Sequence, residues 1–106
     1  MEVKVVVRGV EETASLRTFA EEKIATGLAR FASHVLSATV RLEDETGAAK
    51  GGVDKLCSIE VKLRRGEVRI KERGDDFLAT INVAIDRVKS ALAREAAKTK
   101  RGVGRG

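Results

Sequence analysis

The chain has 106 residues, a net charge of +5, 42% hydrophobic residues and a single cysteine. Its length suits one domain with one core, its apolar content argues against disorder, and one cysteine cannot form an internal disulfide. No apolar run approaches the roughly 18 residues of a membrane span, and the alternating N-terminus MEVKVVVRGV lacks the apolar region of a signal peptide. We therefore expect a single cytoplasmic domain over residues 1–101, a flexible basic tail at 102–106, and no contact with membranes.

The first half of the chain predicts a strand, a helix and a second strand. Residues 2–8 alternate valines with charged residues, apart from Val6, which is typical of a strand with one buried face. Thr13 can cap a helix that runs to about Ala32, and residues 35–43 alternate again. The apolar stripe of this helix consists of Leu16, Ala20, Ile24, Gly27, Leu28 and Phe31.

The next stretch predicts a loop followed by a hairpin. Residues 44–53 contain three glycines and little that could be buried, which favours a mobile loop. Residues 54–64 and 67–73 both alternate apolar with polar side chains, and only a short turn at Arg65-Gly66 separates them. That spacing is typical of two adjacent antiparallel strands.

A longer helix is predicted over residues 75–101, with Asp75 or Asp76 as its N-cap. Its apolar residues recur at steps of three and four, which indicates one face packed on a core. These residues are Phe77, Leu78, Ile81, Ala84, Ile85, Val88, Ala91 and Leu92.

The basic residues gather in this last helix and its tail, where the segment from Arg87 to Gly106 holds seven Lys or Arg and one acid. At about 100° per residue, four of them project together beside the apolar stripe: Arg87, Arg94, Lys98 and Arg101. Lys89 and Lys100 flank the other side, and Lys23 and Arg30 share one flank of the first helix. Such an excess favours a polyanionic partner. The alternative is a solvated helix end whose cations complement the helix dipole.

The order β-α-β-β-β-α predicts an α+β domain with a four-stranded sheet and two helices packed on one face, a two-layer architecture like that of double-stranded RNA-binding domains. We expect the sheet to be antiparallel, because each strand has one apolar face. Its outer face should be modestly basic, carrying Lys4, Arg41, Lys62, Arg64, Arg69 and Lys71 beside Glu2, Glu60 and Glu67.

No catalytic site is evident in the sequence. His34 has no second ligand or nucleophile near it, and Cys57 lies on the apolar side of its strand, so we expect structural roles for both. Asp75-Asp76 suits capping better than metal or acid–base chemistry. The acids at 43–45 suit a solvated turn better than a weak cation site. We expect no enzyme activity, cofactor, metal or small-molecule substrate.

If the polyanionic partner is a nucleic acid, the aromatic residues indicate which class it belongs to. They are all phenylalanine, only 3% of the chain, and Phe19, Phe31 and Phe77 lie in or beside helical stripes. Proteins that stack single-stranded bases need exposed rings. We therefore expect recognition of the backbone and shape of folded RNA.

The order of elements and three stretches of sequence resemble the ribosome hibernation-promoting factors, from Val3 to about Arg101. The stretches are V-K-V-V-V-R-G-V-E-E-T-A-S-L-R-T-F-A-E-E-K-I at the start, G-G-V-D-K-L-C-S-I-E at 51–60, and D-D-F-L-A-T-I-N-V-A-I-D-R-V-K-S-A-L at 75–92. The second of these looks like a divergent branch. The family's second helix commonly reads D-M-Y-A-A-I-D followed by I-D-K-L-x-x-Q-L-x-K-H-K. The positions that match or conservatively replace it are Asp76, Ala79, Ile81, Ile85, Asp86, Arg87, Leu92 and Arg94.

The resemblance implies a short-form factor that binds rRNA in the small ribosomal subunit, where mRNA and the A- and P-site tRNAs sit, and silences ribosomes under stress. Arg87 and Arg94 match family lysines, and Lys23 aligns with a lysine of the first helix. Arg30, Lys89, Lys98, Lys100 and Arg101 join these RNA-binding candidates from the basic surfaces alone. Glu95-Ala96 stands where the family tends to have His-Lys, which thins the basic cluster. The alternatives are a general double-stranded RNA-binding module and a protein-interaction domain with a basic helix.

Overall fold

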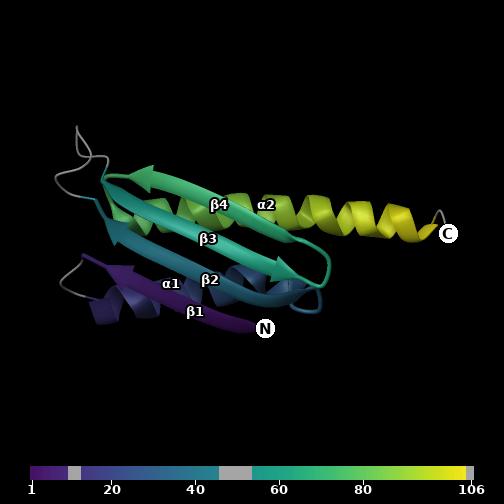
Figure 1. The fold of residues 1–106 in the computed structure, drawn as a ribbon, viewed down its shortest axis with the longest axis horizontal. Helices are drawn as coiled ribbons and strands as arrows, with labels where there is room; N and C mark the ends of the chain where they lie inside the picture. The colour runs from purple at the N-terminus through teal and green to yellow at the C-terminus, as the bar shows by residue number, and fades with distance from the viewer. Residues whose placement is uncertain (10–12, 46–53, 105–106) are drawn as a thin grey trace.

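The computed structural model describes residues 1–9, 13–45 and 54–104, and for Thr13 and residues 99–104 it describes the backbone alone. The elements are β1 (Glu2–Arg8), α1 (Thr13–Leu28), the 3-10 turn η1 (Ala29–Phe31), β2 (Val35–Asp44), β3 (Lys55–Leu63), β4 (Glu67–Gly74) and α2 (Phe77–Gly104). The predicted order β-α-β-β-β-α is therefore confirmed (Figure 1). Of the loop predicted at 44–53, residues 46–53 lie outside the described residues, and Asp44 belongs to β2.

The four strands form one sheet in the order β1-β2-β3-β4. β2–β3 and β3–β4 are antiparallel, but β1 runs parallel to β2, with Val5 opposite Val40. The expectation of an antiparallel sheet was therefore wrong for β1. The reason is α1, which runs back along the sheet and returns the chain to the end at which β1 began. β2 therefore starts at that same end and runs parallel to β1.

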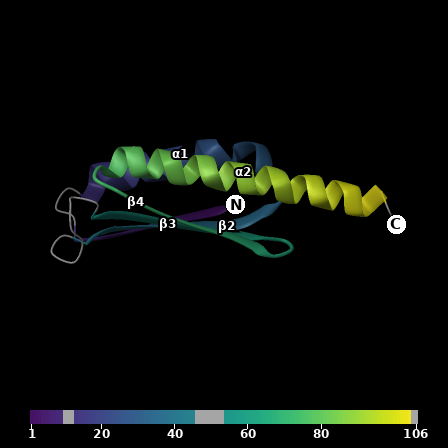
Figure 2. The same cartoon turned by 90° about the horizontal axis from the view of Figure 1, so that it is seen from above.

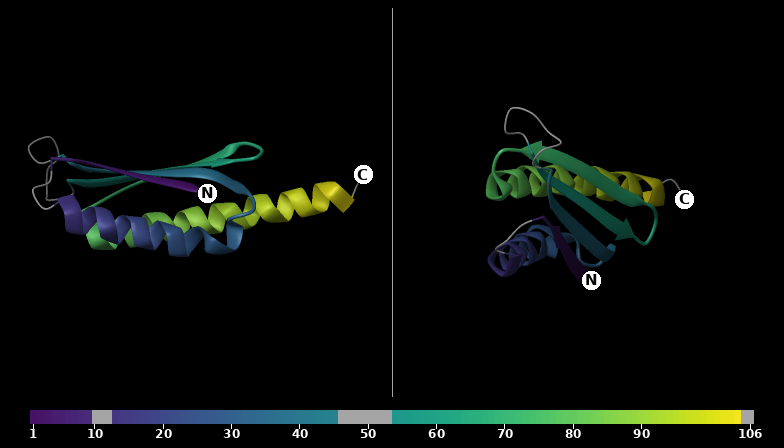
Figure 3. Two further views of the ribbon diagram at one scale, coloured as in Figure 1. Left: turned by 90° about the horizontal axis from the view of Figure 1, so that it is seen from below. Right: turned by 60° about the vertical axis from the view of Figure 1, so that its left-hand side comes forward.

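Both helices cover the same face of the sheet, which confirms the predicted two layers (Figures 2 and 3). α1 packs on β1, and α2 packs on β3, β4 and α1. Four strands about 4.8 Å apart are roughly as wide as two helices of about 10 Å diameter, so the helices fit side by side. The opposite face of the sheet is left without a covering element among the described residues.

α2 is longer than the sheet that it covers, and its C-terminal part projects past the strands and past α1 (Figures 1 and 2). Its last fully packed residue is Leu92, which is 3% exposed. The backbone stays helical to Gly104, three residues beyond the predicted end, so residues 102–104 of the predicted tail are helical. Residues 105–106 lie outside the described part.

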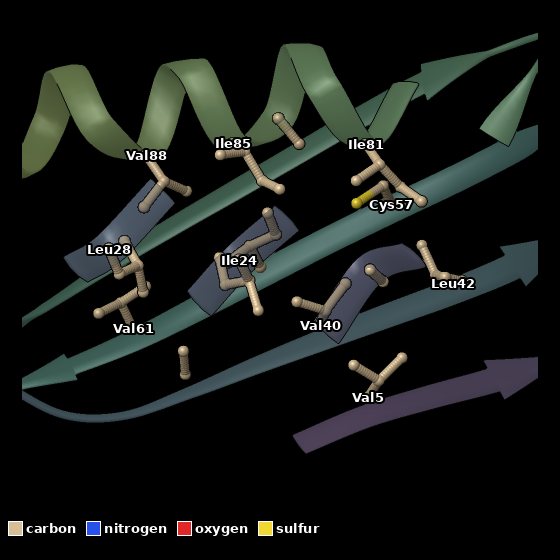
Figure 4. Packing of buried hydrophobic residues seen from close by; sticks show 14 of the residues in the cluster. Val5, Ile24, Leu28, Val40, Leu42, Cys57, Val61, Ile81, Ile85 and Val88 are labelled. Atoms are coloured by element: carbon tan, nitrogen blue, oxygen red, sulfur yellow. The ribbon is translucent and has the colours of Figure 1, made fainter. Parts of the chain in front are cut away.

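The core lies between the helices and the sheet (Figure 4). From α1, Ile24 and Leu28 point into it, and both side chains are 0% exposed. The α2 side chains Ile81, Ile85 and Val88 meet them from the neighbouring helix. The strands contribute the predicted alternate residues, among them Val5, Ala38, Val40, Leu42, Cys57, Ile59, Val61 and Val68.

The start of α2 shows which aspartate is the cap. The Ala79 N–H donates to Asp76 Oδ2 at 3.1 Å, and the Thr80 hydroxyl donates to the Asp76 carbonyl at 2.7 Å. Asp76 therefore satisfies backbone and side-chain donors of the first turn, as an N-cap does. The structural role predicted for this acid pair is confirmed at Asp76.

The acids at the end of β2 are paired with cations. Lys55 Nζ lies 3.0 Å from Asp44 Oδ2 and 3.2 Å from Asp54 Oδ1, and Arg73 Nε donates to Glu45 Oε1 at 2.9 Å. The hydrogen bond to Asp44, and to a smaller extent the one to Asp54, raises the pKa of Lys55. The hydrogen bond to Glu45 raises the pKa of Arg73. These carboxylates tie β2, β3 and β4 together at one end of the sheet, which explains them without a bound cation.

The two helices contact each other at Gly27. A Cβ placed on Gly27 would lie 2.8 Å from Ile85 Cγ2, a separation that real side chains do not adopt. Ile85 is itself buried, at 6% exposure, between α1 and the sheet, so it has little room to move. The absence of a side chain at this position therefore sets the distance between α1 and α2.

Gly27→Ala should lower the free energy of unfolding by about 1–3 kcal/mol, because the added methyl group overpacks the contact with Ile85. This loss should appear even though alanine exceeds glycine in helix propensity by about 1 kcal/mol. Urea unfolding followed by circular dichroism measures the change. Thr26→Ala, at an exposed neighbour in the same helix, is the matched control and should not destabilise. Adding Ile85→Leu to Gly27→Ala removes the branch methyl and should recover part of the loss. A Gly27→Ala variant as stable as wild type would contradict this packing.

Cys57 is 0% exposed and packs as a small hydrophobe, as predicted. Burial, and secondarily the charge of Glu72, raises the pKa of its thiol to about 12. Because the thiolate is the reactive form, the folded protein should be inert to thiol reagents.

Labelling of Cys57 with an aromatic disulfide at pH 8 should be about a thousandfold or more slower in native buffer than in concentrated guanidinium chloride, since the reagent must wait for unfolding. Stopped-flow absorbance measures both rates. Comparable rates in the two solvents would show that the thiol is accessible in the folded state.

Candidate nucleic-acid interface

Three of the predicted RNA-binding residues lie on the helix layer, near the contact between α1 and α2. A Cβ on Gly27 would lie 3.7 Å from Lys89 Cδ, so the aliphatic stem of Lys89 crosses the contact between α1 and α2. Lys23 precedes Gly27 by one helical turn, which puts it on the flank of α1 that faces α2. Arg30, predicted to lie in the first helix, belongs instead to η1, directly after α1. All three side chains are exposed. We call Lys23, Arg30 and Lys89 the helix seam.

Aromatic rings support two of the seam cations. Lys23 Nζ lies 5.6 Å from the centre of the Phe19 ring, and Arg30 Cζ lies 5.0 Å from the centre of the Phe31 ring. Both distances are those of cation–π contacts, which restrict the side chains without neutralising them. The seam therefore holds positive charge in a restricted arrangement, which lowers the entropic cost of binding a polyanion.

The cations predicted to project together from α2 lie on the opposite flank from Lys89, and Arg87 and Arg94 face β4. Arg87 forms an ion pair with Glu72 and donates to the Lys71 carbonyl at 3.5 Å. Lys98 Nζ lies 3.6 Å from Glu95 Oε1. Arg94 borders a shallow hollow between α2 and the β4 edge, which Ile70 and Val83 also line. We call Arg87, Arg94 and Lys98 the β4 flank.

The predicted RNA-binding cations thus lie on two surfaces with different electrostatics. On the β4 flank, Arg87 and Lys98 are each paired with a carboxylate, which reduces the charge available to a ligand. Within the described residues, no carboxylate pairs with any of the three seam cations. Lys100 and Arg101 belong to the helical backbone of α2, but their side chains lie outside the described part.

Two arginines of the β3–β4 turn, Arg64 and Arg65, were not among the predicted RNA-binding residues. Arg64 Nε donates to the Ser33 carbonyl at 3.1 Å, and its backbone N–H donates to the His34 carbonyl at 3.2 Å. These bonds hold Arg64 on the helix side of the sheet, where it borders a hollow with Phe31 and Leu92, so its expected place on the outer face was wrong. Arg65 follows it on the same rim. The only sign of these two residues in the sequence was a basic pair at a turn, and such a pair does not indicate on which face of the sheet its side chains lie.

The outer face of the sheet is basic, as expected, and partly compensated. Arg69 pairs with Glu60 at 2.9 Å and with Glu67. Four other cations of this face have exposed side chains: Lys4, Arg41, Lys62 and Lys71. This face therefore carries free charge as well, but without the neighbouring helix surface that gives the seam its shape.

Neither a metal centre nor a membrane segment is found in the described ranges. There, no three His, Cys, Asp or Glu side chains group as a metal site would require. Nor does the same part of the chain contain a helix of the length and apolarity needed to cross a bilayer. His34, predicted to be structural, is exposed on the rim of the hollow beside Arg64.

Comparison of the sequence and the structure with known proteins identifies the family of this chain. Residues 3–100 match the family described as sigma 54 modulation protein / S30EA ribosomal protein. The N-terminal domain of Protein Y from Thermus thermophilus is 30% identical, with a TM-score of 0.72 over 89% of this chain and 98% of that one. A ribosomal subunit interface protein from Coxiella burnetii, 17% identical, shares the fold, with a TM-score of 0.72 over 92% of this chain and 99% of that one. No curated protein sequence matches. The resemblance to the ribosome hibernation-promoting factors is confirmed, and the chain belongs to the sigma 54 modulation protein / S30EA ribosomal protein family.

Proposed function

We propose that the protein is a ribosome-associated factor that binds small-subunit rRNA through its helical face and inhibits translation in the cytoplasm under stress. The observation that carries the proposal is the helix seam, a set of exposed cations on a domain of a ribosomal protein family. The names of the structural neighbours, one of them a ribosomal subunit interface protein, agree with it.

The seam suits a phosphate backbone better than bases. Lysine and arginine reach phosphates without reading sequence, and each contact releases counterions from the nucleic acid. The helices hold the seam side chains on rigid elements, and the C-terminal part of α2 projects beyond the sheet (Figure 3). RNA contacts by Lys100 and Arg101, and by the β4 flank, remain part of the proposal.

Inhibition would follow from occupancy alone. The domain is an elongated body of 53 × 25 × 17 Å. Bound in the mRNA and tRNA channel of the small subunit, such a body would exclude both ligands sterically. This mechanism needs no catalytic group and no cofactor, and the residues that matter are those that hold the domain in place.

Sedimentation through sucrose with ribosomes and separated subunits tests the proposal. The protein should sediment with small subunits and whole ribosomes, and binding should weaken as salt rises. Free double-stranded RNA as a competitor separates this function from a general RNA-binding module, which would be displaced by equal amounts of duplex. A protein that stays at the top of the gradient even at low salt would refute ribosome binding.

The double variant Lys23→Gln/Lys89→Gln should weaken ribosome binding roughly tenfold and reduce the slope of log affinity against log salt by about 2, because two phosphate contacts are lost. Neither side chain belongs to the core, so the unfolding midpoint should change little. Filter binding over a range of salt concentrations measures affinity and slope together.

The matched control is Lys62→Gln/Lys71→Gln, which removes the same charge from the outer face of the sheet. It should leave the salt slope within about half a unit of wild type. Equal losses in both double variants would show that net charge, and not the seam, determines binding. Arg87 is unsuitable for this test, because its loss also breaks the contact with Glu72 on β4.

A further inference from the structure

A hollow of about 180 Å³ lies where α2 leaves the sheet. It is bordered by η1, by the β3–β4 turn and by the stretch of α2 that follows Leu92. The floor is apolar and consists of Phe31, Leu63, Leu92 and Ala96. Phe31 and Leu92 are only 5% and 3% exposed, so what remains of their surface borders this space. Its volume is somewhat larger than the roughly 150 Å³ cavity that accommodates a benzene ring.

The rim of the hollow is polar and mainly cationic. Arg64, Arg65 and His34 border it on one side, and Glu95 borders it from α2. The bond from Arg64 Nε to the Ser33 carbonyl fixes the guanidinium plane, while the terminal nitrogens still carry donors. An apolar floor of one-ring size beneath two arginines and one carboxylate matches a ligand with a flat ring and an attached anion.

We propose that this hollow binds a single unstacked nucleobase, with the adjoining phosphate held by Arg64 and Arg65. The flat ring would lie against Leu92, Ala96 and the edge of Phe31, and guanidinium groups both stack on bases and pair with phosphates. Glu95 would accept a hydrogen bond from an exocyclic amino group of the base. Such a contact would bind a base without the exposed aromatic rings on which single-stranded bases usually stack.

The same nucleotide chemistry can come from a free mononucleotide or from an unpaired residue of RNA. The RNA form rests on the proposed function, since an extruded rRNA base would then lock the domain at one place on the ribosome. The mononucleotide form does not depend on ribosomes. Titrations without ribosomes therefore keep the two proposals separable.

The first experiment titrates the isotope-labelled full chain with AMP, inorganic phosphate, a short single-stranded oligoadenylate and duplex RNA, followed by NMR. AMP and oligoadenylate should shift the methyl signals of Leu63, Leu92 and Ala96, whereas phosphate should shift only the Arg64 and Arg65 amides. Tighter binding of oligoadenylate than of AMP would identify RNA as the source, and the reverse would identify a free nucleotide. Duplex RNA should leave the methyl signals in place. Failure of both AMP and oligoadenylate to shift them would overturn the proposal.

Variants then separate the hollow from general charge. Ala96→Leu fills the space with no change of charge and should weaken AMP binding at least tenfold, while Ala97→Leu, the same change at an exposed neighbour, should not. Arg65→Gln should weaken it about tenfold, the equivalent of one charge-assisted hydrogen bond, and its exposed side chain contributes no packing. Thermal unfolding checks that each variant is folded. Wild-type AMP affinity in folded Ala96→Leu, or in Arg65→Gln, would contradict the assignment.

Discussion

The contact between α1 and α2 at Gly27 is the constraint on which the proposed RNA-binding surface depends. Two helices must share a face four strands wide, and the missing side chain at Gly27 lets Ile85 fill the space between them. The same approach places the stem of Lys89 against α1 at Gly27, next to the flank that carries Lys23. The packing of the core at Ile85 and the position of Lys89 in the helix seam therefore depend on the same contact. A change that separates the helices would weaken the core and disperse the charge together.

The length of α2 is the second determinant. Its packed part ends at Leu92, yet the helix continues to Gly104 without a sheet beneath it. The projecting part extends the basic surface, and the space below it forms the hollow between η1 and the β3–β4 turn. Residues that contribute nothing to the core, such as Arg65 and Ala96, are thus placed where they can contact a ligand. Charge pairing distinguishes the two surfaces. Glu72 compensates the charge of Arg87, whereas no carboxylate of the described residues pairs with a seam cation, and two of these cations, Lys23 and Arg30, lie against aromatic rings.

The sequence predicted the elements well and their spatial relations less well. The valine alternation placed β1 at its observed ends, and the steps of three and four placed the buried face of α2, because side-chain periodicity follows directly from backbone geometry. Leu78 is the exception, because it was predicted on that face and is 47% exposed. Alternation carries no information on strand direction, so the parallel pairing of β1 and β2 was missed, although the intervening helix implied it. Lys23, Arg30 and Lys89 were identified from the sequence, but the packing of Lys89 on α1 depends on Gly27, which was predicted only as part of an apolar stripe. The pairing of Arg87 with Glu72 and the position of Arg64 depend on contacts between distant residues, which no local pattern encodes.

Electron cryomicroscopy of the protein bound to the small ribosomal subunit tests the central claim most directly. The account predicts density for the domain in the mRNA and tRNA channel, with the helix seam against rRNA phosphates and the outer face of the sheet turned away from the RNA. Density that places the outer face on the rRNA, or the domain outside the channel, would contradict it.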